Sequence, residues 1–144
     1  MDELPIIDQA QVNGIVEVGG PELLRDLLVI MRSNCERRLT EAQAAAAAQR
    51  RPDLERAVHA LRSSAANLGA VRVAALAREL EYGAANQTPE QWAAGVAALA
   101  HAVTEAQAEL ERLAAVPTAP PSPAASRPDA PAPGAPATPR PPQP

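Results

Sequence analysis

Two histidines, His59 and His101, have the side chains best suited to nucleophilic or proton-transfer chemistry near neutral pH in this 144-residue sequence. His59 lies in a stretch whose apolar residues recur with the period of a helix: Leu54, Val58, Leu61, Ala65 and Leu68. With Leu61 at the centre of that apolar face, His59 lies about 160° away around the helix. We therefore expect the imidazole of His59 to face solvent, where a partner can reach it.

The neighbours of His59 suit phosphoryl transfer. Arg62 and Ser63 follow it by one helical turn, where side chains three and four positions apart lie beside each other. The guanidinium of Arg62 is able to stabilise charge on phosphoryl oxygens. The small Ala60, Ser63 and Ala66 leave access for a protein that carries an aspartyl phosphate. A single solvent-facing histidine is more often an ordinary surface residue, so both interpretations stay open on spacing alone.

The twelve residues from His59 to Ala70 resemble the signature of histidine phosphotransfer (HPt) domains. The run reads His-Ala-Leu-Arg-Ser-Ser-Ala-Ala-Asn-Leu-Gly-Ala, and the family pattern is His-x-Leu-Lys-Gly-Ser-x-x-x-Leu-Gly. The resemblance extends over about residues 5–115, and its specific part runs from Val58 to Glu81. It implies a four-helix bundle whose second helix carries the histidine. In such domains that histidine accepts a phosphoryl group from the aspartyl phosphate of one receiver domain and passes it to another.

The resemblance assigns a role to four residues. His59 would be the phosphoacceptor, and Arg62 would replace the lysine that the family usually has near the phosphate. Glu81 falls where the family has Gln or Glu close to the histidine, and it would accept a hydrogen bond from one ring nitrogen and leave the other to attack. Ser63 departs from the pattern, because the family typically has glycine there. The added hydroxyl takes up space beside the ring that receiver loops would use.

The same resemblance defines partners and cofactors. The expected partners are receiver domains of hybrid histidine kinases and of response regulators. No cofactor is expected on this chain, and Mg²⁺ would be held by the receiver. The chain would act as a phosphotransfer intermediate without ATP binding or autokinase activity, since it has no glycine-rich phosphate loop. The alternatives are a non-transferring adaptor that binds and inhibits or sequesters receivers, and a purely structural helical protein.

Composition and sequence pattern predict an all-α protein. The chain has one Trp, one Tyr and no Phe, and the helix formers Ala, Leu, Arg and Glu dominate its first 115 or so residues. Proline, glycine and apolar periodicity divide this part into a short N-terminal helix and four longer ones. The predicted helices cover residues 8–18, 21–48, 52–68 and 71–82, and a fifth begins after Thr88 with a capping box to Gln91. We expect an up-down-up-down antiparallel four-helix bundle.

The last part of the chain has a different composition. Twelve of the sixteen prolines follow residue 116, in a run of Pro, Ala and Ser from Pro117 to Pro144. Such a run cannot form helix or bury a core. We therefore predict a bundle domain over residues 1–115 and a disordered proline-rich tail over residues 116–144.

Charge and cysteine content restrict partners and location. The formal net charge of −4 argues against binding to nucleic acid. The acidic N-terminus lacks the features of a signal peptide, and the most apolar stretch, Leu23 to Met31, is too short to cross a bilayer. The single Cys35 cannot form an internal disulfide. We expect a cytoplasmic monomer that does not insert into membranes.

The remaining candidate residues have structural interpretations. His101 is expected to face solvent without a function, and Cys35 to be a buried thiol. Tyr82 and Trp92 are expected to pack near one end of the bundle. The family resemblance further suggests an apolar docking surface beside His59, formed by Ile6, Ile7, Val12 and Ile15.

Overall fold

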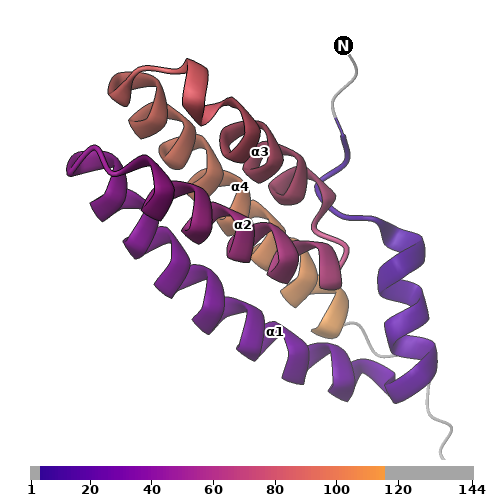
Figure 1. The fold of residues 1–144 in the computed structure, drawn as a ribbon. Coiled ribbons are helices and arrows are strands. Elements are labelled where there is room, and N and C mark those ends of the chain that lie inside the picture. The colour runs from indigo at the N-terminus through magenta and orange to yellow at the C-terminus, as the bar shows by residue number, and fades with distance from the viewer. Residues whose placement is uncertain (1–3, 116–144) are drawn as a thin grey trace, which may run out of the picture.

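The computed structural model describes residues 4–115, and all of the regular elements in that range are helices (Figure 1). In chain order they are α1 (Gln9–Ala47), α2 (Arg51–Asn67), α3 (Val71–Gly83), the short 3-10 helix η1 (Ala84–Asn86) and α4 (Pro89–Ala115). Helix α1 packs against α2 and α4, α2 packs against α3, and α3 packs against α4. The predicted all-α class is confirmed. The tail predicted over residues 116–144 lies outside the described residues.

A break at Gly20 divides α1 into an N-terminal arm, residues 9–19, and a long arm, residues 21–47. Gly20 has φ 77° and ψ 178°, which residues with a Cβ rarely adopt. Pro21 follows it and supplies no backbone donor to continue the first arm. In Figure 1 the indigo N-terminal arm stands at a steep angle to the long arm. The two helices predicted over residues 8–18 and 21–48 correspond to these arms.

The turn between α2 and α3 anchors the N-terminal arm. Gly69 follows α2 in the left-handed conformation, with φ 76°, which is common just after the end of a helix. Its carbonyl oxygen accepts a hydrogen bond of 2.7 Å from the backbone N–H of Asp8. The side-chain amide of Gln11 donates to the carbonyl oxygen of Ala66, also at 2.7 Å. The arm is therefore attached to the C-terminal end of the helix that carries His59.

The start of α4 is fixed by the capping box that the sequence predicts. The backbone N–H of Thr88 donates to Oε1 of Gln91 at 2.8 Å, and the backbone N–H of Gln91 donates to Oγ1 of Thr88 at 3.2 Å. Trp92 is buried one turn later, and its indole N–H donates to the carbonyl oxygen of Ala84 at 3.0 Å. These contacts hold the start of α4 against η1, which directly follows α3.

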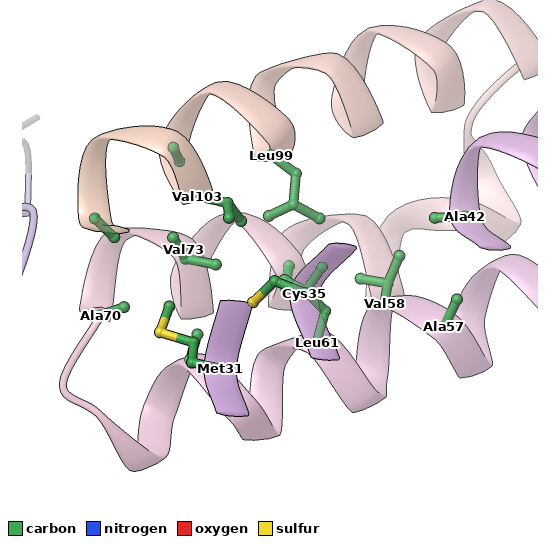
Figure 2. Packing of buried hydrophobic residues seen from close by; sticks show 14 of the residues in the cluster. Met31, Cys35, Ala42, Ala57, Val58, Leu61, Ala70, Val73, Leu99 and Val103 are labelled. Atoms are coloured by element: carbon green, nitrogen blue, oxygen red, sulfur yellow. The ribbon is translucent and has the colours of Figure 1, made fainter. Parts of the chain in front are cut away.

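Leu, Val and Ala side chains from all four helices form one core. Met31 and Cys35 of α1, Val58 and Leu61 of α2, and Leu99 of α4 meet in its centre (Figure 2). The five apolar residues predicted on the inner face are all buried: Leu54, Val58, Leu61 and Ala65 of α2, and Leu68 directly after it. Because these residues face the core, the opposite side of α2 is turned toward solvent.

Cys35 is fully enclosed in this core, so its prediction as a buried thiol is confirmed. Burial raises the pKa of its thiol to about 11, because the thiolate would lose its hydration. The thiol is therefore protonated at neutral pH and serves as a small apolar side chain.

Substitution of Gly69 by alanine is expected to destabilise the bundle. The added Cβ would sit 3.3 Å from the backbone oxygen of Asp8, on a backbone with positive φ. We expect Gly69→Ala to lower the free energy of unfolding by roughly 1–2 kcal/mol, measured by urea denaturation.

Gly14, in the N-terminal arm, is the control, because a Cβ added there meets nothing within 4 Å. Gly14→Ala should raise the free energy of unfolding by about 0.5–1 kcal/mol. Equal effects of the two changes would contradict this description of the turn.

Burial of Cys35 predicts a specific loss of stability at alkaline pH. Between pH 9.0 and about 11 the thiol of the unfolded chain releases its proton while the folded one keeps it. Stability therefore falls as pH rises through this window, by about 2–3 kcal/mol in total from this one group. Urea denaturation at a series of pH values measures how the free energy of unfolding changes with pH. The Cys35→Ala variant should lack the decrease that comes from the thiol. An identical slope in the variant would show that the thiol of the folded protein ionises normally.

Candidate functional site

His59 lies on the solvent side of α2, as the helical period predicts. Its side chain is 56% exposed, whereas the neighbouring Val58 and Leu61 are fully buried. The small residues expected beside it have the predicted accessibility, since Ser63 and Ala66 are exposed and Ala60 is half-buried. The imidazole can therefore be approached from solvent without displacing a bulky neighbour on α2.

A carboxylate from α3 binds the ring of His59. Oε2 of Glu81 lies 2.9 Å from Nδ1 of His59, and its side chain is only 15% exposed. The other oxygen, Oε1, accepts a hydrogen bond of 3.0 Å from Nε of Arg62. Glu81 therefore joins two side chains of α2 from the opposing helix. The structure thus brings together His59, Arg62 and Glu81, three of the four residues expected at the site, and Ser63 lies one turn from the histidine.

The contact with Glu81 determines which nitrogen of His59 carries the proton. An ionised carboxylate only accepts hydrogen bonds, so Nδ1 must carry the hydrogen that Glu81 receives. Nη2 of Arg62 is also 3.2 Å from Nδ1, but it cannot donate to a nitrogen that is itself protonated. This approach of Arg62 is therefore a close cationic contact rather than a hydrogen bond. Within the described part of the chain Nε2 has no hydrogen-bond partner, and in the neutral ring it holds the lone pair.

Tyr82 differs from its sequence prediction. We expected it to pack near one end of the bundle, but it is 63% exposed on α3, next to Glu81. The guanidinium carbons of Arg62 and Arg78 lie 5.6 Å and 5.7 Å from the centre of its ring, within the range of cation–π contacts. The position of Arg78, four residues before Tyr82, was a detectable signal for one of these contacts. The contact with Arg62 joins two helices and had no signal in the sequence.

The predicted apolar docking surface is wrong in part. Ile7 and Val12 are buried in the core and cannot contact a partner, while Ile6 and Ile15 are partly buried against it. They are buried because the N-terminal arm and the residues just before it pack their apolar side chains onto the bundle. The arm thus supports the turn after α2 instead of presenting these side chains to solvent.

The second histidine, His101, pairs with a residue of its own helix. The side chain of His101 is 76% exposed, as predicted, and its Nε2 lies 3.4 Å from Oε2 of Glu105 on the next turn. Among residues 4–115, His, Cys, Asp and Glu side chains nowhere gather in a group of three able to hold a metal ion. None of the helices described is long and apolar enough to span a membrane.

Comparisons with known proteins identify the family and support the fold. The Hpt domain family model matches residues 26–116, which is more than half of the chain. The crystal structure of histidine-containing phosphotransfer protein B (HptB) from Pseudomonas aeruginosa PAO1 is similar, with a TM-score of 0.69 and 23% sequence identity. The similarity covers 76% of this chain and 95% of that one. At this identity the solved structure supports the fold alone. Among curated proteins, none matches this chain.

Proposed function

Since the chain belongs to the Hpt domain family, we propose that it accepts a phosphoryl group on His59 from the aspartyl phosphate of one receiver domain and passes it to another. The observation that carries this proposal is the state of the imidazole. Its Nδ1 is bound to Glu81, and Nε2 has a lone pair on an exposed surface of α2. This is the arrangement that a nucleophilic histidine needs.

The proposed transfer is a single displacement at phosphorus. The lone pair of Nε2 of His59 forms the N–P bond as the bond from phosphorus to the aspartyl oxygen breaks, and the bonding pair leaves with that oxygen as a carboxylate. The ring keeps its hydrogen on Nδ1 and acquires positive charge. Transfer to the second receiver is the reverse reaction, in which an aspartate oxygen attacks phosphorus and Nε2 recovers its lone pair.

Charge compensation at the ring supports this direction of attack. The carboxylate of Glu81 accepts the Nδ1 hydrogen and stabilises the positive charge that develops on the imidazole. Arg62 is half-buried beside it, and its guanidinium is one turn from His59 on the same helix. There it would stabilise the oxygens of the transferred phosphoryl group. Glu81 and Arg62 therefore act on opposite charges of the same transition state.

The partners would supply everything else that the reaction needs. We infer that the donors and acceptors are receiver domains of hybrid histidine kinases and of response regulators. Mg²⁺ would be held by the receiver, and this chain would need neither a cofactor nor ATP. The short connections between consecutive packed helices support the up-down-up-down order of the bundle. We further propose that the bundle domain, residues 1–115, works as a cytoplasmic monomer.

Ser63 supports one alternative function. It is exposed one turn after His59, where the family usually has glycine, and at this spacing its side chain would lie beside the ring. If receivers need this space for phosphoryl transfer, the chain would bind them without exchanging phosphate. Such an adaptor would inhibit or sequester them.

Replacement of His59 separates transfer from binding. Phosphorylated receiver domains are mixed with the wild type and with His59→Gln, and acid-labile, alkali-stable label on the bundle protein is measured. We expect label on the wild type and at least about a hundredfold less on His59→Gln, because the nucleophile is lost. The control is His101→Gln, which removes the other exposed histidine and should label normally. If no receiver transfers label while one binds wild type and His59→Gln equally, the adaptor function is correct and transfer is refuted.

Restoring glycine at position 63 tests the departure from the family pattern. We expect Ser63→Gly to speed transfer from a receiver by roughly two- to tenfold, equivalent to about 0.5–1.4 kcal/mol in the barrier. The rate is measured by rapid quenching at saturating receiver. Ser64→Gly is the matched control, because it makes the same substitution on α2 at a half-buried position. A rate unchanged by Ser63→Gly would show that the serine does not obstruct the receiver.

A further inference from the structure

We propose that Tyr82 is a positioning residue whose ring holds the guanidinium of Arg62 beside His59. This inference rests on the proposed function, because the benefit of positioning Arg62 is faster phosphoryl transfer to His59. It concerns a residue outside the motif, on the helix opposite the histidine. Three contacts surround the guanidinium group of Arg62 and carry this inference.

The guanidinium of Arg62 has three neighbours. Nε donates to Oε1 of Glu81 at 3.0 Å, and the central carbon lies 5.6 Å from the centre of the Tyr82 ring. Nη2 lies 3.2 Å from Nδ1 of His59. The first two contacts come from adjacent residues of α3, and the third is with the ring of the reacting histidine, at the nitrogen that does not attack. The group is thus held from α3 while its terminal nitrogen is directed at the histidine of α2.

One of these three contacts is unfavourable and must be offset. Nδ1 carries a hydrogen for Glu81, so the cationic Nη2 approaches the positive end of an N–H bond. A single hydrogen bond from Nε to Glu81 still lets the terminal nitrogens rotate away toward solvent. The face of an aromatic ring attracts a guanidinium and restricts where the plane of that group can lie. Tyr82 therefore supplies the second attachment that keeps Nη2 near His59.

The exposure of Tyr82 fits a positioning role rather than a packing role. The ring is 63% exposed, so its burial contributes little to the core. Arg78 lies 5.7 Å from the same ring and helps to hold it, four residues earlier on α3. The hydroxyl of Tyr82 takes no part in these ring contacts, so phenylalanine should replace tyrosine here.

The test uses a small phosphoryl donor, so that receiver docking cannot affect the result. Phosphoramidate is mixed with the full-length protein, and phosphorylation is followed by intact-protein mass spectrometry. In this reaction Nε2 of His59 bonds to phosphorus as the P–N bond of the donor breaks. The donor nitrogen is protonated as –NH3+, so it leaves with the bonding pair as neutral ammonia. The variants are Tyr82→Leu and Tyr82→Phe, each made with Arg62 present and with Arg62→Gln. Exchange of the Arg62 Nε–H with water is measured by NMR on the same proteins.

We expect Tyr82→Leu to slow phosphorylation by about two- to fivefold, the factor that an exposed cation–π contact provides. Tyr82→Phe should retain the wild-type rate, and Tyr82→Leu should have no effect when Arg62 is Gln. The Nε–H of Arg62 should exchange faster in Tyr82→Leu, because the group is less restricted. A rate unaffected by Tyr82→Leu overturns the proposal. Equal slowing by Tyr82→Leu in the Arg62→Gln background also overturns it, because Tyr82 would then act independently of Arg62. Slowing by Tyr82→Phe overturns it as well.

Failure of the proposed function gives a different result. If the wild type takes no phosphoryl group from phosphoramidate or from any receiver, phosphotransfer by His59 is refuted. The NMR exchange then decides the role of Tyr82 by itself. Faster exchange in Tyr82→Leu supports positioning of Arg62 by the ring, and unchanged exchange refutes it.

Discussion

The carboxylate of Glu81 is the interaction on which the site depends. Its two oxygens bind Nδ1 of His59 and Nε of Arg62, so one group from α3 orients both side chains of α2. Glu81 is itself largely shielded from solvent, which strengthens its electrostatic interactions. Without it the imidazole would rotate freely and either nitrogen could carry the hydrogen. The reactivity of the histidine is therefore a property of the pair of helices rather than of α2 alone.

The rest of the fold keeps these two helices in register. Val58 and Leu61 of α2 pack into the same core as Val73 of α3 (Figure 2). His59 is exposed on the opposite side of α2. The left-handed Gly69 makes the tight turn between the helices, and the N-terminal arm is bonded to that turn through Asp8. A shift of α3 by one residue would move Glu81 about 100° around its helix and away from the ring. The core and the turn therefore set the geometry of the hydrogen bond.

Sequence patterns predicted the features that follow from local rules. Helical periodicity predicted the exposed face of His59, and glycine and proline divided the chain into helices close to those that the structure has. The contact between His59 and Glu81 was expected from the family resemblance alone. The exposed Tyr82 was predicted incorrectly, because periodicity assigns a residue to a face but does not locate the side chains of a neighbouring helix. The same limit applies to the protonated nitrogen, which depends on a distance between two helices.

The central claim is that Glu81 keeps Nδ1 protonated and leaves Nε2 of His59 to carry the phosphoryl group. Identification of the phosphorylated nitrogen tests it most directly. The protein is labelled with ¹⁵N in its histidines and phosphorylated, and NMR coupling between phosphorus and nitrogen is measured. The geometry predicts coupling to Nε2 of His59, with the hydrogen retained on Nδ1. Phosphorus bonded to Nδ1, or to His101, would contradict the account.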